Sequence, residues 1–323
     1  MSTGDASLDG GVAFTTSEFN YYIASSNTPM EDEVLTCPFD KPECLAQNKA
    51  NGAMKGFDCH IYDGRADAGL CGDELDHPTF DKRGLFFTSH ESQVSDFWDE
   101  EQILAVHYPE MAALAKRLTG CDIAATAAHA LRGDAKEHQA ARNAAFTVHN
   151  DFSDTMRDQF LRMHEKGSST VVSSSLETGG LGVTDEQLRS GRLAVINFWR
   201  PIQATPLSRN PLAVLDASTI GDDDVVLCRH PAKDENFSFI QHYRLPVPFI
   251  NTLIRPNPSH KWFYFPAMTR GEVMVFKNYD SCGLMPHNGV GMHSSFEHPD
   301  TPPNTPPRES IEIRVACFWH GGE

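Results

Sequence analysis

The stretch Phe146-Thr-Val-His-Asn-Asp-Phe-Ser153 constrains the fold of this chain most strongly. An apolar run ends there in His149 and Asp151, which lie two positions apart. Side chains alternate between the two faces of an extended strand, so these two point to the same side. An imidazole and a carboxylate on one face supply two of the three ligands of a facial 2-His-1-carboxylate iron site. The stretch therefore predicts a metal centre at the end of a strand.

A facial site needs a third ligand, and the C-terminal part of the chain offers several histidines. We predict His293, which stands between Gly-Val-Gly-Met and Ser-Ser-Phe. His287 lies in a Pro/Asn/Gly-rich loop, and His298 precedes a proline that restricts its conformation. The competing interpretation of the His-x-Asp triplet is a surface histidine beside the start of a helix, with Asp151 or Ser153 as the N-cap. The predicted metal ligands and catalytic residues are His149, Asp151 and His293.

Two arginines downstream complete the predicted site. Arg308-Glu-Ser310 opens a strand with alternating apolar residues, and Arg314 lies further along the same face. If the iron is chelated by the keto acid end of 2-oxoglutarate, the distal carboxylate needs a cationic partner with fork geometry. We predict that Arg308 and Ser310 bind this carboxylate together, with Arg314 as the alternative residue. For Arg314, a place on a solvated strand face is an equally strong interpretation. The predicted cofactors are Fe(II) and 2-oxoglutarate.

The overall charge narrows the classes of partner. The net charge is −17 and the sequence pI is about 5.2, which argues against nucleic acid and anionic membranes as partners. No apolar span approaches the roughly 20 residues that a membrane helix needs. The expected partners are therefore a small-molecule substrate, 2-oxoglutarate and dioxygen, without nucleic acid or membrane. A homodimer is left open.

The eight cysteines contain no CxxC pair, and eight in 323 residues do not indicate a disulfide-rich scaffold. The N-terminal sequence Met-Ser-Thr-Gly-Asp-Ala has neither the basic region nor the apolar region of a secretory signal. We therefore expect mostly reduced thiols and a cytoplasmic location.

The pattern along the chain predicts an α+β fold. Helices are expected near residues 95–106, 108–118 and 155–166, and short strands dominate afterwards. We predict an antiparallel double-sheet jelly roll that carries the site, with helices flanking one sheet. Residues 56–323 are expected to form this single domain, with its helices within 95–166, and residues 1–55 an N-terminal arm packed on it. Strands are expected at Glu18–Ile23, Phe57–Asp63, Asp81–Thr88, Leu193–Trp199, Leu212–Leu215, Asp224–Cys228, Phe237–Ile240, Trp262–Phe265, Glu272–Phe276 and Ile311–Trp319.

Several motifs in order resemble a known family. They are Val195-Ile-Asn-Phe-Trp-Arg-Pro-Ile202, Pro211-Leu-Ala-Val-Leu-Asp216, Trp262-Phe-Tyr-Phe-Pro266, Glu272-Val-Met-Val-Phe-Lys-Asn-Tyr-Asp-Ser281, His293-Ser-Ser-Phe-Glu-His-Pro299 and Pro306-Pro-Arg-Glu-Ser-Ile-Glu-Ile-Arg314. Together they are similar to the fungal hydroxylase/desaturase family related to the aspergillic-acid hydroxylase and the cephamycin methoxylase component. The resemblance covers about residues 57–319. It implies a double-stranded β-helix (jelly roll, cupin-like), non-heme iron, 2-oxoglutarate and a secondary-metabolite substrate, and it places the three ligands, Arg308 and Ser310 on the family's site positions.

These observations favour a non-heme Fe(II)/2-oxoglutarate-dependent oxygenase, an oxidoreductase of the dioxygenase class. The substrate would be a small secondary metabolite, for which an amino-acid origin is compatible with the family. Hydroxylation, desaturation and oxidative cyclisation are all open. Two alternatives keep the same fold: a non-catalytic jelly-roll protein that binds a small molecule, and a zinc-dependent hydrolase that uses the same three ligands.

Overall fold

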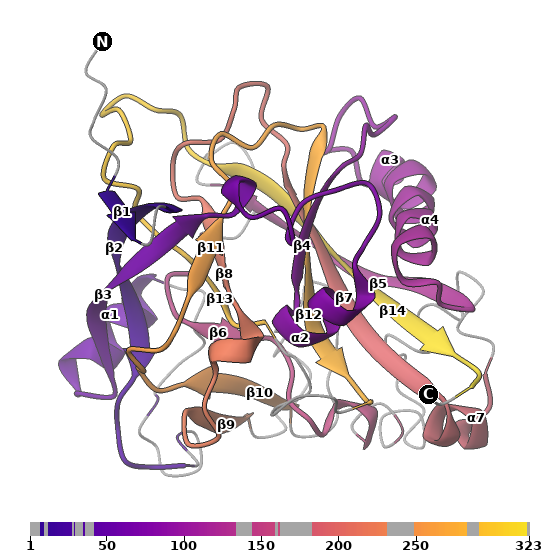
Figure 1. Cartoon of the computed structure of the whole chain (residues 1–323), viewed down its shortest axis with the longest axis horizontal. Helices are drawn as coiled ribbons and strands as arrows, with labels where there is room; N and C mark the ends of the chain where they lie inside the picture. The colour runs from indigo at the N-terminus through magenta and orange to yellow at the C-terminus, as the bar shows by residue number, and fades with distance from the viewer. Residues whose placement is uncertain are drawn as a thin grey trace.

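Two β-sheets face each other in the computed structural model, and helices lie along the outer side of one of them (Figure 1). The structure describes residues 7–9, 12–27, 29, 35, 42–133, 144–158, 161, 183–230, 249–282 and 291–321. Apolar side chains from both sheets meet in one buried cluster, which includes Val214 and Phe263 of one sheet and Met274 and Phe276 of the other. The interior between the two sheets is therefore a packed core.

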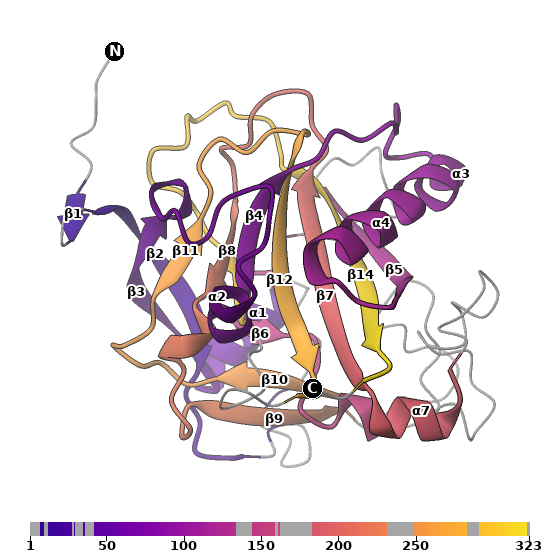
Figure 2. The ribbon, with the colours of Figure 1, turned by 45° about the vertical axis from the view of Figure 1, so that its right-hand side comes forward.

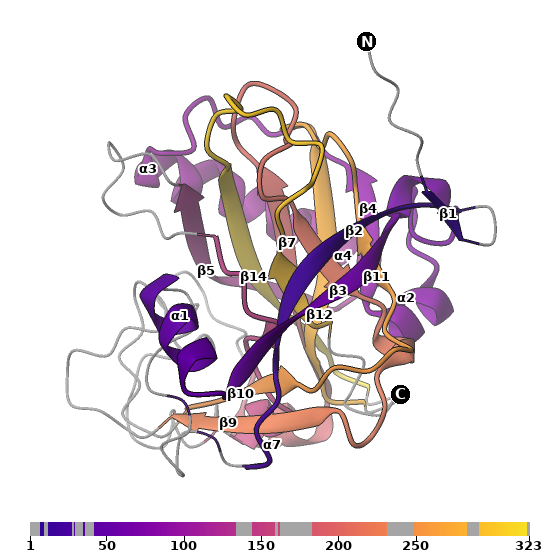
Figure 3. The ribbon, with the colours of Figure 1, turned by 90° about the vertical axis from the view of Figure 1, so that its left-hand side faces the viewer.

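The larger sheet has nine strands in the order β1-β2-β3-β11-β8-β13-β6-β10-β9. Neighbouring strands are antiparallel, except that β11 pairs with β3 in parallel. Figure 3 looks onto the β2–β3 ribbon at one edge of this sheet. Its strands are β1 (Ser7–Asp9), β2 (Val12–Tyr22), β3 (Met54–Asp63), β6 (His149–Asn150), β8 (Leu212–Leu215), β9 (Val225–His230), β10 (Phe249–Ile254), β11 (Trp262–Tyr264) and β13 (His293–Ser295).

The second sheet has five antiparallel strands in the order β4-β12-β7-β14-β5. Its central strands β12, β7 and β14 are buried along almost their whole length, and β-branched and aromatic residues fill them. Figure 2 shows these strands side by side with α4 across them. The strands are β4 (Leu85–Ser89), β5 (Ile123–Gly133), β7 (Arg192–Pro201), β12 (Glu272–Asp280) and β14 (Glu309–Trp319).

The helix α4 covers the outer face of the second sheet by packing on β5 and β14. It begins with Pro109 in its first turn and ends at Gly120, which adopts a φ of 66° that favours glycine. No helix within the described ranges is long and apolar enough to cross a membrane. The helices are α1 (Pro42–Ala50), η1 (Gly64–Ala66), α2 (His77–Arg83), α3 (Glu100–Gln102), the π-helical η2 (Ile103–His107), α4 (Tyr108–Thr119), α7 (Asp185–Ser190) and η3 (Ala217–Thr219).

Most of the predicted strands are present, and two differences have clear causes. The strand predicted over Asp81–Thr88 is wrong in its first half, because α2 continues to Arg83 and Gly84 ends it at a φ of 74°. The strand β5 was not predicted, because its alanine-rich sequence has a low intrinsic preference for strands. It is held by its ladder with β14.

Some predicted elements lie wholly or partly outside the described residues. The strand at Phe237–Ile240 is one of these, and of the helix over residues 155–166 only 155–158 and 161 are described. The segment predicted as an N-terminal arm contributes β1, β2 and α1. Its strand β2 pairs with β3 from Phe14 to Tyr22, so this segment forms part of the nine-stranded sheet.

Candidate metal centre

Three predicted ligands converge on one point between the sheets. Single ligand atoms from His149, Asp151 and His293 all lie within 4.8 Å of one another. The distance from His149 Nε2 to Asp151 Oδ1 is 3.7 Å. The side chains are buried, with at most 5 % of each residue exposed. Three ligands with bonds of about 2.0–2.2 Å on one face of an ion lie roughly 3 Å apart, so these side chains would move slightly closer together around an ion.

Strand pairing brings the two histidines together. His293 of β13 is the register partner of His149 of β6, and their ring centroids are 4.5 Å apart. Phe276 of β12 packs on His293 from the opposite sheet, with ring centroids 4.9 Å apart. Asp151 follows β6 directly, so its carboxylate lies on the same side as His149.

Backbone carbonyls orient both imidazoles. His149 Nδ1 lies 2.7 Å from the carbonyl oxygen of Thr147, and His293 Nδ1 lies 3.4 Å from that of Gly291. A carbonyl only accepts, so each Nδ1 carries the proton and donates, and each Nε2 keeps its lone pair for a metal. The two rings therefore present the same nitrogen to the same point.

The electrostatics suit a cation. Burial, and then the neighbouring His293, lower the pKa of His149 to about 4, and burial lowers the pKa of His293. Both are thus neutral near pH 7. Burial alone would raise the pKa of Asp151, but Arg314 and the two histidines outweigh it and hold this pKa far below its usual range. Two neutral imidazoles and one carboxylate are the donor set of a facial iron site.

The predicted residues Arg308 and Ser310 lie at the start of β14. Arg308 Nη1 donates to the carbonyl oxygen of Asn210 and to Ser295 Oγ, both at 2.8 Å. Ser295 lies two residues after His293 in β13, so its side chain shares the face of that ligand. Two residues along a strand correspond to about 7 Å, a span that a five-carbon dicarboxylate can bridge. Ser310 Oγ is buried and has no hydrogen-bond partner within the described part of the chain.

The alternative residue, Arg314, lies elsewhere in the site. Its guanidinium donates from Nε at 3.1 Å and from Nη2 at 2.6 Å to Oδ2 of Asp151. Its Nη2 also lies 2.8 Å from Oε1 of Glu312, a buried carboxylate whose pKa is raised by burial. Arg314 thus contacts a predicted metal ligand directly.

Three residues at this site were not singled out from the sequence. Asn278 Nδ2 donates to Asp151 Oδ2 at 3.1 Å and to Asn197 Oδ1 at 2.7 Å. Both asparagines are fully buried, and Glu312 is 5 % exposed. Buried amides and carboxylates within strands that are otherwise apolar were the available signal, because such groups need a partner.

Of the two competing histidines, His298 is described and is not part of this cluster. His298 Nε2 lies 2.9 Å from the hydroxyl of Tyr264, and its Nδ1 accepts from the backbone of Asp300. His287 lies outside the described residues. Among the described residues, His149, Asp151 and His293 are the only cluster of three such groups close enough to hold one ion.

Comparison with known proteins identifies the family. A family profile described as "Oxidoreductase/YMDC permease-like domain" matches residues 19–318, which is nearly the whole chain. The chain belongs to this family.

Curated relatives of this oxidoreductase-family chain are fungal. It is 31% identical over 139 residues to "Aspirochlorine biosynthesis protein N" of Aspergillus oryzae, covering 43% of this chain and 53% of that protein. It is 29% identical over 219 residues to "Fe(II)/2-oxoglutarate-dependent dioxygenase nvfI" of Aspergillus novofumigatus, covering 67% and 66%. The matches thus span between half and two thirds of the length of these two relatives. Further relatives carry the name hydroxylase/desaturase, and the predicted resemblance to that group is confirmed.

A solved structure supports the fold. The "iron and alpha-ketoglutarate-dependent endoperoxidase NvfI W199F variant" superimposes with a TM-score of 0.66 at 22% identity, and the match covers 100% of both chains. Identity at this level shows a shared fold. The predicted jelly-roll, cupin-like double-stranded β-helix is confirmed.

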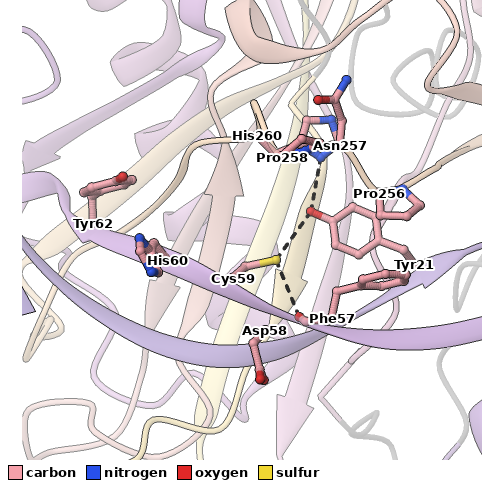
Figure 4. Close-up of a pocket in the computed structure, with 10 residues that line it drawn as sticks. All are labelled: Tyr21, Phe57, Asp58, Cys59, His60, Tyr62, Pro256, Asn257, Pro258 and His260. Carbon is pink, nitrogen blue, oxygen red and sulfur yellow. Dashed lines mark hydrogen bonds between the residues drawn. The ribbon is translucent and has the colours of Figure 1, made fainter. Parts of the chain in front are cut away.

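A pocket of this oxidoreductase-family chain lies away from the metal centre (Figure 4). It has a volume of about 480 Å³ and is lined by residues of β2 and β3 and of segment 256–260. At its base, Tyr21 accepts a hydrogen bond from Trp262 Nε1 at 2.8 Å and contacts His260 Nδ1 at 3.2 Å, and His260 Nε2 lies 3.1 Å from Asp224. Trp262 faces away from His293, because its neighbour Phe263 shares the register of Val214 and His293. These polar groups satisfy one another.

Proposed function

We propose that this chain is a non-heme Fe(II)/2-oxoglutarate-dependent oxygenase that acts on a small secondary metabolite. The observation that carries this proposal is the buried convergence of His149, Asp151 and His293, with both Nε2 atoms and one carboxylate oxygen turned to a common point. The names of the fungal relatives agree with it. The two alternatives, a metal-free binding protein and a zinc hydrolase, have no observation in their favour.

In this proposal His149, Asp151 and His293 would hold the iron. The two imidazoles bind as neutral donors and Asp151 supplies the negative charge, so the set binds Fe(II) without first losing a proton at pH 7. When bound, the iron supplies the activation of dioxygen that couples decarboxylation of 2-oxoglutarate to oxidation of the substrate. Burial of the ligands excludes bulk water from this point.

Arg308 and Ser310 would bind the distal carboxylate of 2-oxoglutarate. The buried Ser310 hydroxyl, which has no partner within the described residues, would donate to one oxygen, and the guanidinium of Arg308 would pair with the negative charge. Trp199 lies beneath this guanidinium, with Arg308 Cζ 5.8 Å from its ring centroid. A buried aromatic ring and a buried arginine fix the position of the group. Arg308 already has two acceptors, which would hold it in place while it binds the co-substrate.

The substrate is proposed to be a small molecule oxidised by hydroxylation, desaturation or oxidative cyclisation. A cytoplasmic location, the absence of nucleic-acid and membrane partners, and the question of a homodimer stay predictions from charge and sequence. The proposed small-molecule chemistry is compatible with all of them.

Succinate release tests the proposal. Purified protein is supplied with Fe(II), 2-oxoglutarate and air in the presence of a panel of small metabolites, beside the His149→Ala variant. We expect succinate from the wild type, stimulated by some members of the panel, and background levels from the variant. Metabolite hydrolysis in the absence of dioxygen, without succinate, would favour the zinc hydrolase instead.

A further inference from the structure

The outer oxygen of Asp151 is held by two residues of the second sheet. Oδ2 accepts from Arg314 Nε at 3.1 Å, from Arg314 Nη2 at 2.6 Å and from Asn278 Nδ2 at 3.1 Å. All three side chains are buried, and the most exposed is Arg314 at 4 %. The other oxygen, Oδ1, is the one that lies near His149 Nε2. The protein therefore occupies one oxygen of the carboxylate. The other oxygen is turned to the metal point, which is the place where His149, Asp151 and His293 converge.

We propose that Arg314 is a positioning residue for the metal ligand Asp151, and not part of the 2-oxoglutarate site. Its guanidinium keeps Asp151 a one-oxygen ligand and holds that oxygen toward the metal. This inference rests on the proposed function, since it assumes that iron binds at the three ligands.

Arg314 is itself fixed by its neighbours. Glu312 lies on the same face of β14, and its Oε1 is 2.8 Å from Arg314 Nη2. Asn197 of β7 is the register partner of Arg314, and it accepts from Asn278 at 2.7 Å. Three adjacent strands thus contribute to one buried network around Asp151 Oδ2. Each residue of this network is buried and has at least one polar contact with another member.

One of the two donors to Asp151, Asn278, stands at an irregularity of its strand. The register between β12 and β7 shifts between Lys277 and Tyr279, which places Asn278 at the irregularity. The register between β14 and β5 shifts directly after Arg314. Bulges re-aim side chains and recur next to active sites. Asn278 therefore stands where its own strand departs from regular pairing. Arg314 lies in a ladder with β7 that stays regular, and the residue skipped opposite it belongs to β5.

The number of coordination positions on the iron explains why Asp151 should bind through only one oxygen. An octahedral ion with two imidazoles and a one-oxygen carboxylate keeps three open positions. The keto acid end of 2-oxoglutarate would take two of them, and one would remain for dioxygen. A two-oxygen carboxylate would remove that last position. Charge-assisted bonds to Oδ2 compete with this second mode of binding.

A measurement of iron affinity under conditions without turnover tests the inference. Fe(II) binding is measured anaerobically by competition with a colorimetric chelator for the wild type, Arg314→Gln and Arg314→Lys. Loss of a partner that orients a metal ligand weakens metal binding by roughly 10–100-fold, and we expect Arg314→Gln to show this loss. Arg314→Lys keeps the positive charge but loses the planar pair of donors of the guanidinium, so an intermediate loss of iron affinity is expected. It also serves as the second variant if Arg314→Gln fails to fold.

Arg200 provides a matched control. It is a buried arginine in β7 of the same sheet, but it donates to His90 and to the carbonyl oxygen of Arg270 on the side away from the metal point. Arg200→Gln should lower the melting temperature and leave iron affinity within about twofold of the wild type, because it contacts no ligand. A purely structural role of Arg314 would give both variants the same behaviour.

Two further outcomes overturn the inference. Folded Arg314→Gln with the iron affinity of the wild type would show that the contact does not position Asp151. A loss of 2-oxoglutarate affinity of about tenfold or more in iron-saturated Arg314→Gln, without loss of iron affinity, would assign Arg314 to the co-substrate, since tenfold corresponds to one strong charged contact. A wild type that binds no Fe(II) would refute the proposed function as well, so the two failures are distinguishable.

Discussion

His293 of β13 stands directly opposite His149 of β6 in an antiparallel ladder, with the two ring centroids 4.5 Å apart. Side chains opposite each other in such a ladder lie on the same face of the sheet. A shift in register by one residue would turn one of the imidazoles to the other face. The metal point therefore depends on the pairing of two very short strands, β6 and β13.

Removal of either histidine should abolish iron binding. His293→Ala leaves only one imidazole and one carboxylate, and we expect Fe(II) titration of the variant to show no stoichiometric site. His298→Ala is the matched control, because His298 is bonded to Tyr264 and not to the metal point. Loss of iron from His298→Ala with retention in His293→Ala would contradict the assignment of the third ligand.

Arg308 and Ser310 should determine the affinity for 2-oxoglutarate. A hydrogen bond to a charged group contributes about 1.5–3 kcal/mol, so Arg308→Gln should raise the KM for 2-oxoglutarate by roughly 10–100-fold. Ser310→Ala removes a neutral donor and should raise it by a few fold. Steady-state succinate assays give both values, with iron binding measured in parallel. An unchanged KM in both variants would show that the distal carboxylate binds elsewhere.

Local patterns in the sequence were enough to predict many residues of the candidate site. His149 and Asp151 stand two positions apart, and Arg308 and Ser310 repeat this spacing, so alternation alone assigns each pair to one face. The long apolar strands β7 and β14 were equally visible from their composition. The predicted residue pairs and the fold class therefore followed from short-range patterns, and His293 was predicted as the best of three candidate histidines.

The other features of the site depend on strand pairing between residues far apart in the sequence. β6 has two residues and β13 has three, too few for a periodic signal. The contact of Arg314 with Asp151 joins β14 to the end of β6, and alternation along β14 cannot reveal a partner in another sheet. The position of Asn278 depends on a register shift that one strand's sequence does not encode.

The metal-free protein should lose stability as the pH falls below neutral. Burial, and then the nearby Arg200, lower the pKa of His107 to about 3 from a usual value of 6.5. The unfolded chain takes up a proton on this residue below about pH 6.5 and the folded chain does not, so the stability present above that pH is lost as the pH falls toward about 3. This one histidine should lower the free energy of unfolding by roughly 2 kcal/mol between pH 7.5 and 5.

Urea unfolding at these two pH values measures the effect. His107→Gln should make the difference between them smaller, because the substituted side chain does not titrate. Equal differences for the wild type and the variant would show that His107 does not stay neutral in the folded protein.

The pocket of Figure 4 should contribute to stability and not to turnover. Tyr21→Phe leaves the buried Trp262 Nε1 without its acceptor, which costs about 1–3 kcal/mol. Denaturant unfolding should show this loss, while the rate of succinate formation at a permissive temperature stays at the level of the wild type. A large loss of kcat in a folded Tyr21→Phe variant would place this pocket in the reaction.

Anaerobic titration of the apoprotein with Fe(II) and then 2-oxoglutarate tests the central claim most directly. Iron held by His149, Asp151 and His293 and chelated by the keto acid should develop a weak visible charge-transfer band, at one iron and one 2-oxoglutarate per chain, and the band should be absent from His149→Ala. A wild type that develops no band, or a His149→Ala variant that develops the same one, would contradict the account.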